Sequence, residues 1–192
     1  MRDTSPKRAA ELIEAMEPDE AVDVLRDMER AEADAILANV PVDLARQLTG
    51  LLGYPETMAG GFMTTALAKG VLTATVAEVR RQLAEQKTHS ADIDSVAVVD
   101  ESGRLLSDLP LFDLLVADDS TPLSELIPDT RPVTVHPEAF LDEVVDRLTE
   151  ARASSVVVVD PEGRPMGRVL ADDVIDALKE GGLRLKLPWL FH

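Results

Sequence analysis

The second half of the chain contains an internal duplication, in which one short segment recurs in nearly the same form. Residues 96–104 read VAVVDESGR, and residues 156–164 read VVVVDPEGR. In each copy the apolar run predicts a buried strand. The Asp-x-x-Gly-Arg that follows predicts a tight turn, because Asp can bond the following backbone and Gly can adopt a positive φ. Each copy is therefore expected to form a hairpin, with second strands at 105–109 and 165–169.

Matching elements are expected around each hairpin. Short strands precede it at 71–72 and 132–135, and helices begin after it near Asp113 and Asp173. An amphipathic helix lies between the first two strands of each copy, with apolar faces of Val76, Val79 and Leu83, and of Leu141, Val144 and Leu148. The resulting order of strand, helix, strand, strand, helix is that of a CBS motif. Two such units are expected to pack sheet against sheet, since one alone leaves an apolar face open.

The first part of the chain, up to position 53, is predicted to be helical. Apolar residues recur at helical spacing, and the unit that begins at Pro18 recurs at Pro41. Proline and acids favour helix starts there. This period indicates a helical repeat stack, but only about two repeats are present, fewer than the three or so that such stacks usually need. We therefore expect a truncated stack, or one that packs against another part of the chain.

The fold class predicted from these patterns is α+β, with an N-terminal α-helical repeat domain followed by a tandem CBS (βαββα) pair. Pro55 and the pair Gly60-Gly61 break the helical pattern and mark the boundary. The expected divisions are a truncated helical domain at 1–53, a connector at 54–62, a first CBS repeat at 63–127, a second at 128–180 and a tail at 181–192.

Several segments resemble the cytosolic region of MgtE-type magnesium transporters. The stretch from Tyr54 to Gly60, followed by Met63-Thr64, resembles the connector between that family's helical domain and its first CBS repeat. Residues 113–119 and 172–176 resemble the exit segments of the two repeats. The resemblance covers roughly residues 9–180. The helical domain is shorter than the family's, and the transmembrane helices are missing, so the chain is expected to be either a fragment or a stand-alone relative.

This resemblance implies a regulator of a transport gate. In such proteins Mg²⁺ binds between acidic faces of the helical domain and the CBS pair, usually in a homodimer, and holds the module compact. The expected partners are therefore a second copy, bound through the helices at 75–86 and 137–151, and a membrane transporter domain.

Charge and composition limit the other possibilities. The chain has 36 acidic and 19 basic residues, a formal net charge of −17, which disfavours nucleic acid and anionic membrane surfaces. It has no cysteine, so thiolate sites and cysteine catalysis are excluded. The sequence has no apolar run of the length that spans a bilayer, so membrane insertion is not predicted. We expect a cytoplasmic protein, at the inner face of the membrane if it is part of a transporter.

Three acids at the start of the last predicted helix are the main metal candidates. Asp172 and Asp176 share a helix face, and Asp173 and Asp176 are three positions apart. Mg²⁺ keeps several waters and needs only one or two carboxylates. The resemblance also places metal-contacting acids at Asp173 and Asp176. The alternative is that these acids cap the helix and complement its dipole.

Partners for this cluster are expected among the acids of the helical domain. The candidates are Asp23, Asp27, Glu29 and Asp34, each of which is otherwise explained as a solvated surface residue. Where the resemblance implies a further acid, before the central strand of the second repeat, this chain has Arg152. At least one metal site of the family is therefore expected to be lost or changed.

Adenine nucleotides are the alternative ligand, because many CBS pairs bind them through a Gly-x-x-Thr/Ser-x-x-Asp run. Asp113 and Asp173 occupy the acidic position, but Pro110 and Leu170 replace the hydroxyl. A ribose without that hydrogen bond loses affinity, so only weak binding is expected.

Neither the histidines nor the serines show catalytic or zinc-ligand spacing, and a non-enzymatic protein is predicted. The leading hypothesis is a Mg²⁺-sensing regulatory module. A nucleotide-responsive CBS regulator and a ligand-independent dimerisation or docking scaffold remain as alternatives.

Overall fold

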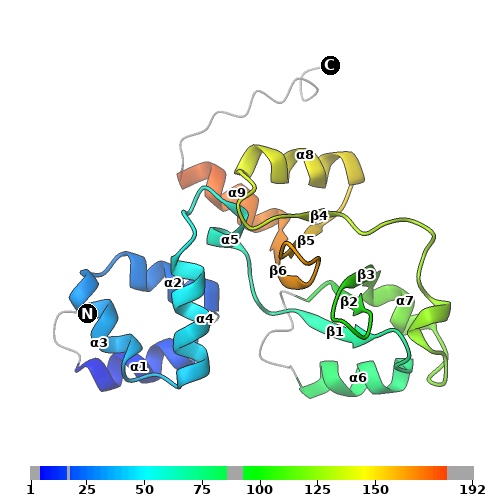
Figure 1. Cartoon of the computed structure of the whole chain (residues 1–192), viewed down its shortest axis with the longest axis horizontal. Coiled ribbons are helices and arrows are strands. Elements are labelled where there is room, and N and C mark those ends of the chain that lie inside the picture. The colour runs from blue at the N-terminus through cyan, green and yellow to red at the C-terminus, as the bar shows by residue number, and fades with distance from the viewer. Residues whose placement is uncertain (1–4, 17, 86–92, 181–192) are drawn as a thin grey trace.

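The computed structural model describes residues 5–16, 18–85 and 93–180, and of the last helix it leaves the side chains of residues 176 and 178–180 undescribed. The predicted tail at 181–192 lies outside the described residues. A helical unit and two small three-stranded sheets with their helices make up the described part (Figure 1). This is the predicted α+β class.

Four helices form the N-terminal unit, with α1 packed on α3 and α2 packed on α4. Ser5 caps the first helix, where its hydroxyl accepts the Arg8 N–H, and Pro6 occupies the first helical position. Leu12 of α1 is 44% exposed, although the neighbouring Ile13 is buried. The bounds are α1 Pro6–Glu14, α2 Pro18–Arg26, α3 Arg30–Leu37 and α4 Val42–Leu52.

The two repeats that follow share one topology. In each, a short first strand runs parallel to the central strand, and the third strand runs antiparallel to it. The register shifts after the same residue of both central strands, Val98 and Val158. The first repeat comprises β1 Ala68–Val71, α6 Val76–Glu85, β2 Ser95–Val99, β3 Leu105–Pro110, α7 Leu111–Val116 and the short 3-10 helix η2 Leu123–Glu125. The second comprises β4 Thr134–Val135, α8 Leu141–Ala151, β5 Ser155–Val159, β6 Pro165–Leu170 and α9 Ala171–Glu180.

The hairpin turns have the predicted chemistry. A carboxylate oxygen of Asp100 accepts the Arg104 N–H at 2.9 Å, and Asp160 accepts the Arg164 N–H at 2.8 Å. Gly103 and Gly163 have φ of 80° and 81°, which a residue with a Cβ adopts only under strain. Both hairpins were therefore predicted correctly, whereas β1 begins at Ala68, before the expected strand at 71–72.

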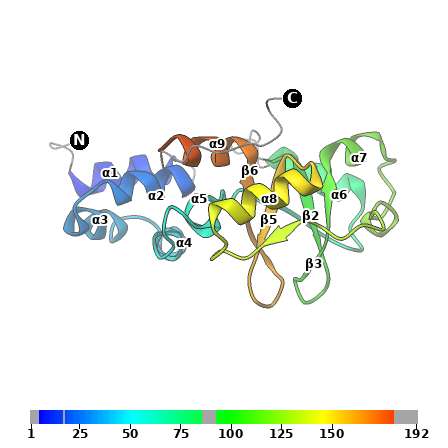
Figure 2. The ribbon, with the colours of Figure 1, turned by 90° about the horizontal axis from the view of Figure 1, so that it is seen from above.

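The two glycines of the connector lie in a short helical turn that follows the end of α4. Gly60 and Gly61 are buried within a single helical turn, α5 Ala59–Phe62, which contacts α4 and β6 and thus lies between the helical unit and the second repeat (Figure 2). A Cβ on Gly61 would stand 2.1 Å from the Pro55 carbonyl oxygen, so close backbone packing requires glycine at this position. Here Gly permits a compact turn rather than a flexible one.

The connector is attached to the second repeat, although the first repeat follows it in the chain. Ala59 and Gly60 donate backbone hydrogen bonds of 2.8 Å to the carbonyls of Ala139 and Pro137. Further along, Thr64 exchanges two 2.8 Å backbone hydrogen bonds with Arg168 on β6. One hydrophobic core accordingly runs through the helical unit, the connector and the second repeat, and the first repeat has a core of its own.

Candidate metal and nucleotide sites

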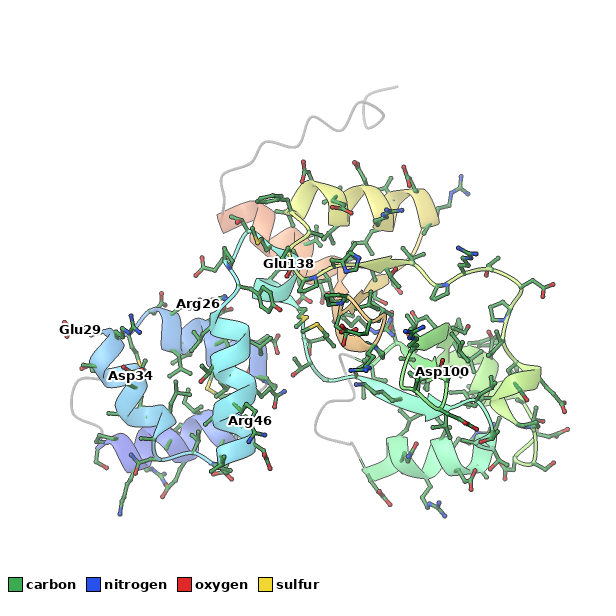
Figure 3. The ribbon with its side chains drawn as sticks, viewed as in Figure 1. Arg26, Glu29, Asp34, Arg46, Asp100 and Glu138 are labelled. Atoms are coloured by element: carbon green, nitrogen blue, oxygen red, sulfur yellow. The ribbon has the colours of Figure 1, made fainter. Side chains whose placement is uncertain are left out.

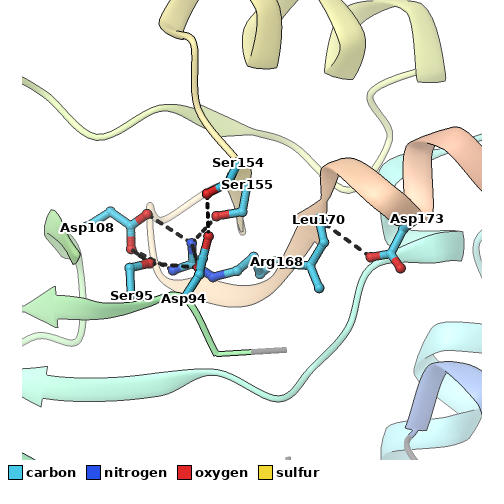
Figure 4. A network of polar contacts seen from close by, with 8 residues as sticks. All are labelled: Asp94, Ser95, Asp108, Ser154, Ser155, Arg168, Leu170 and Asp173. Carbon is cyan, nitrogen blue, oxygen red and sulfur yellow. Dashed lines mark hydrogen bonds and ion pairs between the residues drawn. The ribbon is translucent and has the colours of Figure 1, made fainter. Parts of the chain in front are cut away.

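The predicted acids of α9 stand at its N-terminus. Asp172 is exposed in the first turn. Asp173 is partly buried, and one of its carboxylate oxygens accepts the backbone N–H of Leu170 at 3.1 Å (Figure 4). The side chain of Asp176 lies outside the described residues. Asp173 therefore makes the helix-capping contact that the alternative interpretation expected.

The candidate acids of the helical unit are exposed. Asp23 is 71% exposed and forms an ion pair of 3.3 Å with Arg26, while Asp27 is exposed just beyond the end of α2. Glu29 and Asp34 lie on or beside α3, at the end of the molecule remote from the sheets (Figure 3). Within the described residues, no three His, Asp or Glu side chains converge as a metal-binding group. The predicted acids whose side chains are described thus do not form a ready-made cage.

Arg152 occupies the position where the family resemblance implies an acid. It ends α8 with φ of 52° and ψ of 38°, a left-handed conformation that is uncommon for a residue with a side chain. Its backbone N–H caps the helix on the carbonyls of Leu148 and Thr149. The side chain is exposed, so this surface carries a cation where the resemblance places a carboxylate.

The two positions expected to contact a nucleotide ribose are equivalent in the structure. Pro110 is the N-cap of α7, and Leu170 is the residue directly before α9. Asp113 and Asp173 are the third residues of these two helices, and both are partly buried. Each helix start thus presents an acid without the hydroxyl that would accompany it in a ribose site.

A buried polar cluster lies between the two sheets and was not predicted. Its centre is Arg168 on β6, with only 1% of its side chain exposed. The guanidinium donates to Asp108 of β3 at 2.6 and 3.0 Å, and lies 3.0 Å from the carboxylate of Asp94, just before β2 (Figure 4). It also donates to the hydroxyl of Ser155. One cation of the second repeat is therefore held by two carboxylates of the first.

Serine hydroxyls complete this cluster. Ser154 donates to Asp94 at 2.8 Å, and Ser95 donates to Asp108 at 2.8 Å. Burial raises the pKa of Asp94. The Arg168 guanidinium and the hydroxyls of Ser155, Ser154 and Ser95 outweigh that effect and hold the pKa below its usual value. Asp94 is thus kept ionised beside the buried cation.

A second arginine, Arg26, joins the helical unit to the connector. Its guanidinium donates to the carbonyl oxygens of Tyr54 and Gly61, both at 2.8 Å, and to that of Leu51 at 3.4 Å. Its side chain is 13% exposed. Because the Leu51 carbonyl belongs to the last turn of α4, the cation also stabilises the negative end of that helix.

Sequence reasoning missed both arginines for different reasons. Arg168 and Asp108 occupy equivalent positions of the duplication, so a base and an acid at matching places in the two copies could have been noticed. No comparable signal existed for Arg26, since its acceptors are backbone carbonyls, which every residue possesses.

An open cavity of about 420 Å³ lies beside β1 and α6 in the first repeat. Its polar lining includes Lys69, Arg81 and Gln82, and burial lowers the pKa of Lys69. The Lys69 ammonium donates to the carbonyl of Pro165 at 2.9 Å. None of the acids predicted to bind metal or nucleotide lines this cavity.

Comparison with known proteins shows that this chain is similar to magnesium transporters. The family model of the MgtE intracellular N domain matches residues 1–57, and that of the CBS domain matches residues 123–180. The magnesium transporter MgtE of Thermus thermophilus is 37% identical over 136 residues, and that of Enterococcus faecalis is 29% identical over 136 residues. The matched regions are 69% and 71% of this chain, but only 29% and 30% of those proteins.

Solved structures give the same result over more of the chain. The soluble part of a magnesium transporter superimposes with a TM-score of 0.87 and 27% identity, over 95% of this chain and 71% of that one. The cytosolic domain of the Mg²⁺ channel MgtE in complex with ATP gives a TM-score of 0.84 and 32% identity, over 92% and 72% of the two chains.

These relatives are transporters rather than enzymes. Among the described helices of this chain, none has the length and hydropathy to cross a bilayer. The order of helical unit, connector and paired sheets agrees with that of the solved relatives over nearly all of the chain. The chain therefore belongs to the MgtE magnesium-transporter family, as the region made of the intracellular N domain and the paired CBS domains.

Proposed function

We propose that this chain is a cytosolic Mg²⁺-responsive regulatory module of a magnesium transporter. The observation that supports this proposal is the match to the cytosolic domain of the Mg²⁺ channel MgtE over 92% of the chain. In the proposed arrangement the helical unit and the CBS pair form one body at high Mg²⁺, and a membrane transporter domain is the partner that senses this state.

The acids at the start of α9 are the proposed ligands. Asp172, Asp173 and Asp176 offer hard oxygen donors, which suit Mg²⁺. Because no group of three acids converges among the described residues, the residues fit a partly hydrated ion held by one or two carboxylates rather than an enclosed one. Asp23 and Asp27 on the helical side would contribute through the surrounding negative potential.

A Mg²⁺ titration of the melting temperature tests this proposal. Mg²⁺ at tenfold its dissociation constant should stabilise the protein by about 1.4 kcal/mol per site. NaCl at matched ionic strength separates specific binding from screening. The double variant Asp173→Asn/Asp176→Asn should lose most of the Mg²⁺-specific shift and keep the NaCl response.

A matched control removes two charges elsewhere. Glu125→Gln/Asp129→Asn alters exposed acids of the first repeat and the segment after it, and should keep the full Mg²⁺ shift. If the α9 double variant also keeps it, these acids only cap the helix and the metal assignment is wrong.

Adenine nucleotide is the second candidate ligand, because the solved MgtE relative is an ATP complex. Pro110 and Leu170 lack the ribose-binding hydroxyl, and the paired carboxylates of Asp94 and Asp108 would repel phosphates entering between the sheets. We expect calorimetry to detect no low-micromolar binding of ATP or AMP. Such binding would instead favour the nucleotide-responsive regulator, and a protein that responds to neither ligand would favour the docking scaffold.

A further inference from the structure

The buried cluster around Arg168 lies where the two repeats meet, and its members are related by the duplication. Position 108 of the first repeat corresponds to position 168 of the second, and position 94 corresponds to 154. In the structure each of these residues contacts its own equivalent: Asp108 binds Arg168, and Asp94 accepts a hydrogen bond from Ser154. Contacts between equivalent residues are those that lie on a two-fold axis.

Residues on such an axis determine which units can pair. If two copies of the first repeat met in this way, Asp108 would face Asp108. Two copies of the second repeat would bring Arg168 against Arg168. A like-charged pair in a site where the guanidinium is 1% exposed is strongly unfavourable, since each charge loses water and gains repulsion.

Other contacts across this interface are also polar. The Leu105 N–H donates to the carbonyl of Gly163 at 2.9 Å, and Lys69 donates to that of Pro165. The acceptors of these two bonds are backbone carbonyls, which any repeat possesses, although the donor Lys69 is specific to the first repeat, since the equivalent position of β4 is Thr134. The ion pairs between described side chains of the two repeats are those of Arg168 with Asp94 and Asp108.

We propose that the Asp94–Asp108–Arg168 cluster makes the inner face of the first repeat a docking surface for the second repeat, and excludes pairing of like repeats. The occupant of the surface is thus the other repeat and not a second copy of the same one. A dimer of chains must then form through other surfaces and leave each pair of unlike repeats intact.

Exchange of charges across the axis tests this proposal. In Arg168→Asp an acid at position 168 faces Asp108, as it would if two first repeats paired. This variant should have a melting temperature about 10 °C lower. The quadruple variant Asp94→Ser/Ser154→Asp/Asp108→Arg/Arg168→Asp exchanges the two sides completely. It should restore at least half of the lost melting temperature, because the guanidinium introduced at position 108 then faces the two carboxylates introduced at positions 154 and 168.

The matched control is Arg131→Asp, the same charge change at an exposed position between the repeats, which should leave the melting temperature nearly unchanged. Pairing itself can be measured, because the chain has no cysteine. Spin labels on the double variant Glu101→Cys/Pro161→Cys, at equivalent exposed sites in the two turns, report the distance between the hairpins. The distribution of distances between the two labels should broaden in Arg168→Asp and narrow again in the quadruple variant.

The quadruple variant tests the proposal even if Arg168→Asp fails to fold. If the exchange leaves the protein as unstable as the single variant, Arg168 acts only through its local surroundings in the second repeat. If Arg168→Asp is as stable as the control, the charges do not govern pairing. Either result would overturn the proposal.

Discussion

At the scale of single residues, Arg26 fastens the helical unit to the connector. Its guanidinium satisfies carbonyls of Leu51, Tyr54 and Gly61 at the end of α4 and in the turn after it. We expect Arg26→Met to lower the free energy of unfolding by about 2–3 kcal/mol, because hydrogen bonds from a charged donor are lost and partly buried acceptors stay unpaired. Chemical denaturation followed by circular dichroism measures this loss.

Arg46 provides the control for this prediction. Like Arg26 it forms an ion pair with an acid one turn earlier on its helix, Asp43 at 3.2 Å, but its side chain is 76% exposed (Figure 3). Arg46→Met should change stability by less than about 0.5 kcal/mol. Equal effects of the two substitutions would show that the carbonyl contacts of Arg26 contribute little.

At the scale of elements, the turn α5 depends on glycine for its close packing. Gly61→Ala would place a Cβ 2.1 Å from the Pro55 carbonyl oxygen, and because the nearest atoms belong to the backbone, no flexible group can move away. The expected cost is at least about 2 kcal/mol of unfolding free energy. Thermal unfolding of the single variant measures it.

Gly50→Ala is the matched substitution in α4. Apart from the neighbouring backbone of α4 itself, no heavy atom lies within 4 Å of the added Cβ, so alanine should stabilise this helix by up to about 1 kcal/mol through its better helix propensity. We therefore expect alanine to destabilise the protein at position 61 and to stabilise it at position 50. A mild effect at Gly61 would mean that the connector can adjust without detaching from the second repeat.

The elements show what the sequence could and could not predict. The order of strands and helices and the hairpin turns were predicted, because apolar periodicity and the Asp-x-x-Gly turn are local signals. The α5 turn was missed because the hydrogen bonds of Ala59 and Gly60 go to Ala139 and Pro137, far away in the chain. The metal-binding acids remain a prediction from a motif, because spacing along a helix does not fix which surfaces face each other.

At the scale of the whole molecule, a homodimer through the CBS pair remains a prediction. Exposed apolar side chains suggest which helices meet: Phe112, Leu115 and Val116 on α7 are 69%, 72% and 66% exposed, and Ile175 on α9 is 53% exposed. The helices α7 and α9 are therefore expected to contribute to the dimer interface together with α6 and α8. An apolar patch of this kind on an acidic protein is typical of a covered surface.

We expect Phe112→Asp to convert the dimer to a monomer at micromolar concentration, because a carboxylate buried in the interface would lack a partner. Multi-angle light scattering measures the mass. Val42→Asp, at a 74% exposed apolar residue on the helical unit, is the control and should stay dimeric. A monomeric unaltered protein in the presence of Mg²⁺ would contradict the predicted dimer.

The attachment of the connector to the second repeat also affects how the chain folds during synthesis. The buried core cluster of the first repeat lies between Ala68 and Leu123, so this repeat can fold as soon as it leaves the ribosome. Thr64, in contrast, must wait for Arg168, which is translated about 5–20 s later at ordinary elongation rates. The helical unit is therefore synthesised first, but it can pack against the second repeat only after that repeat has been synthesised.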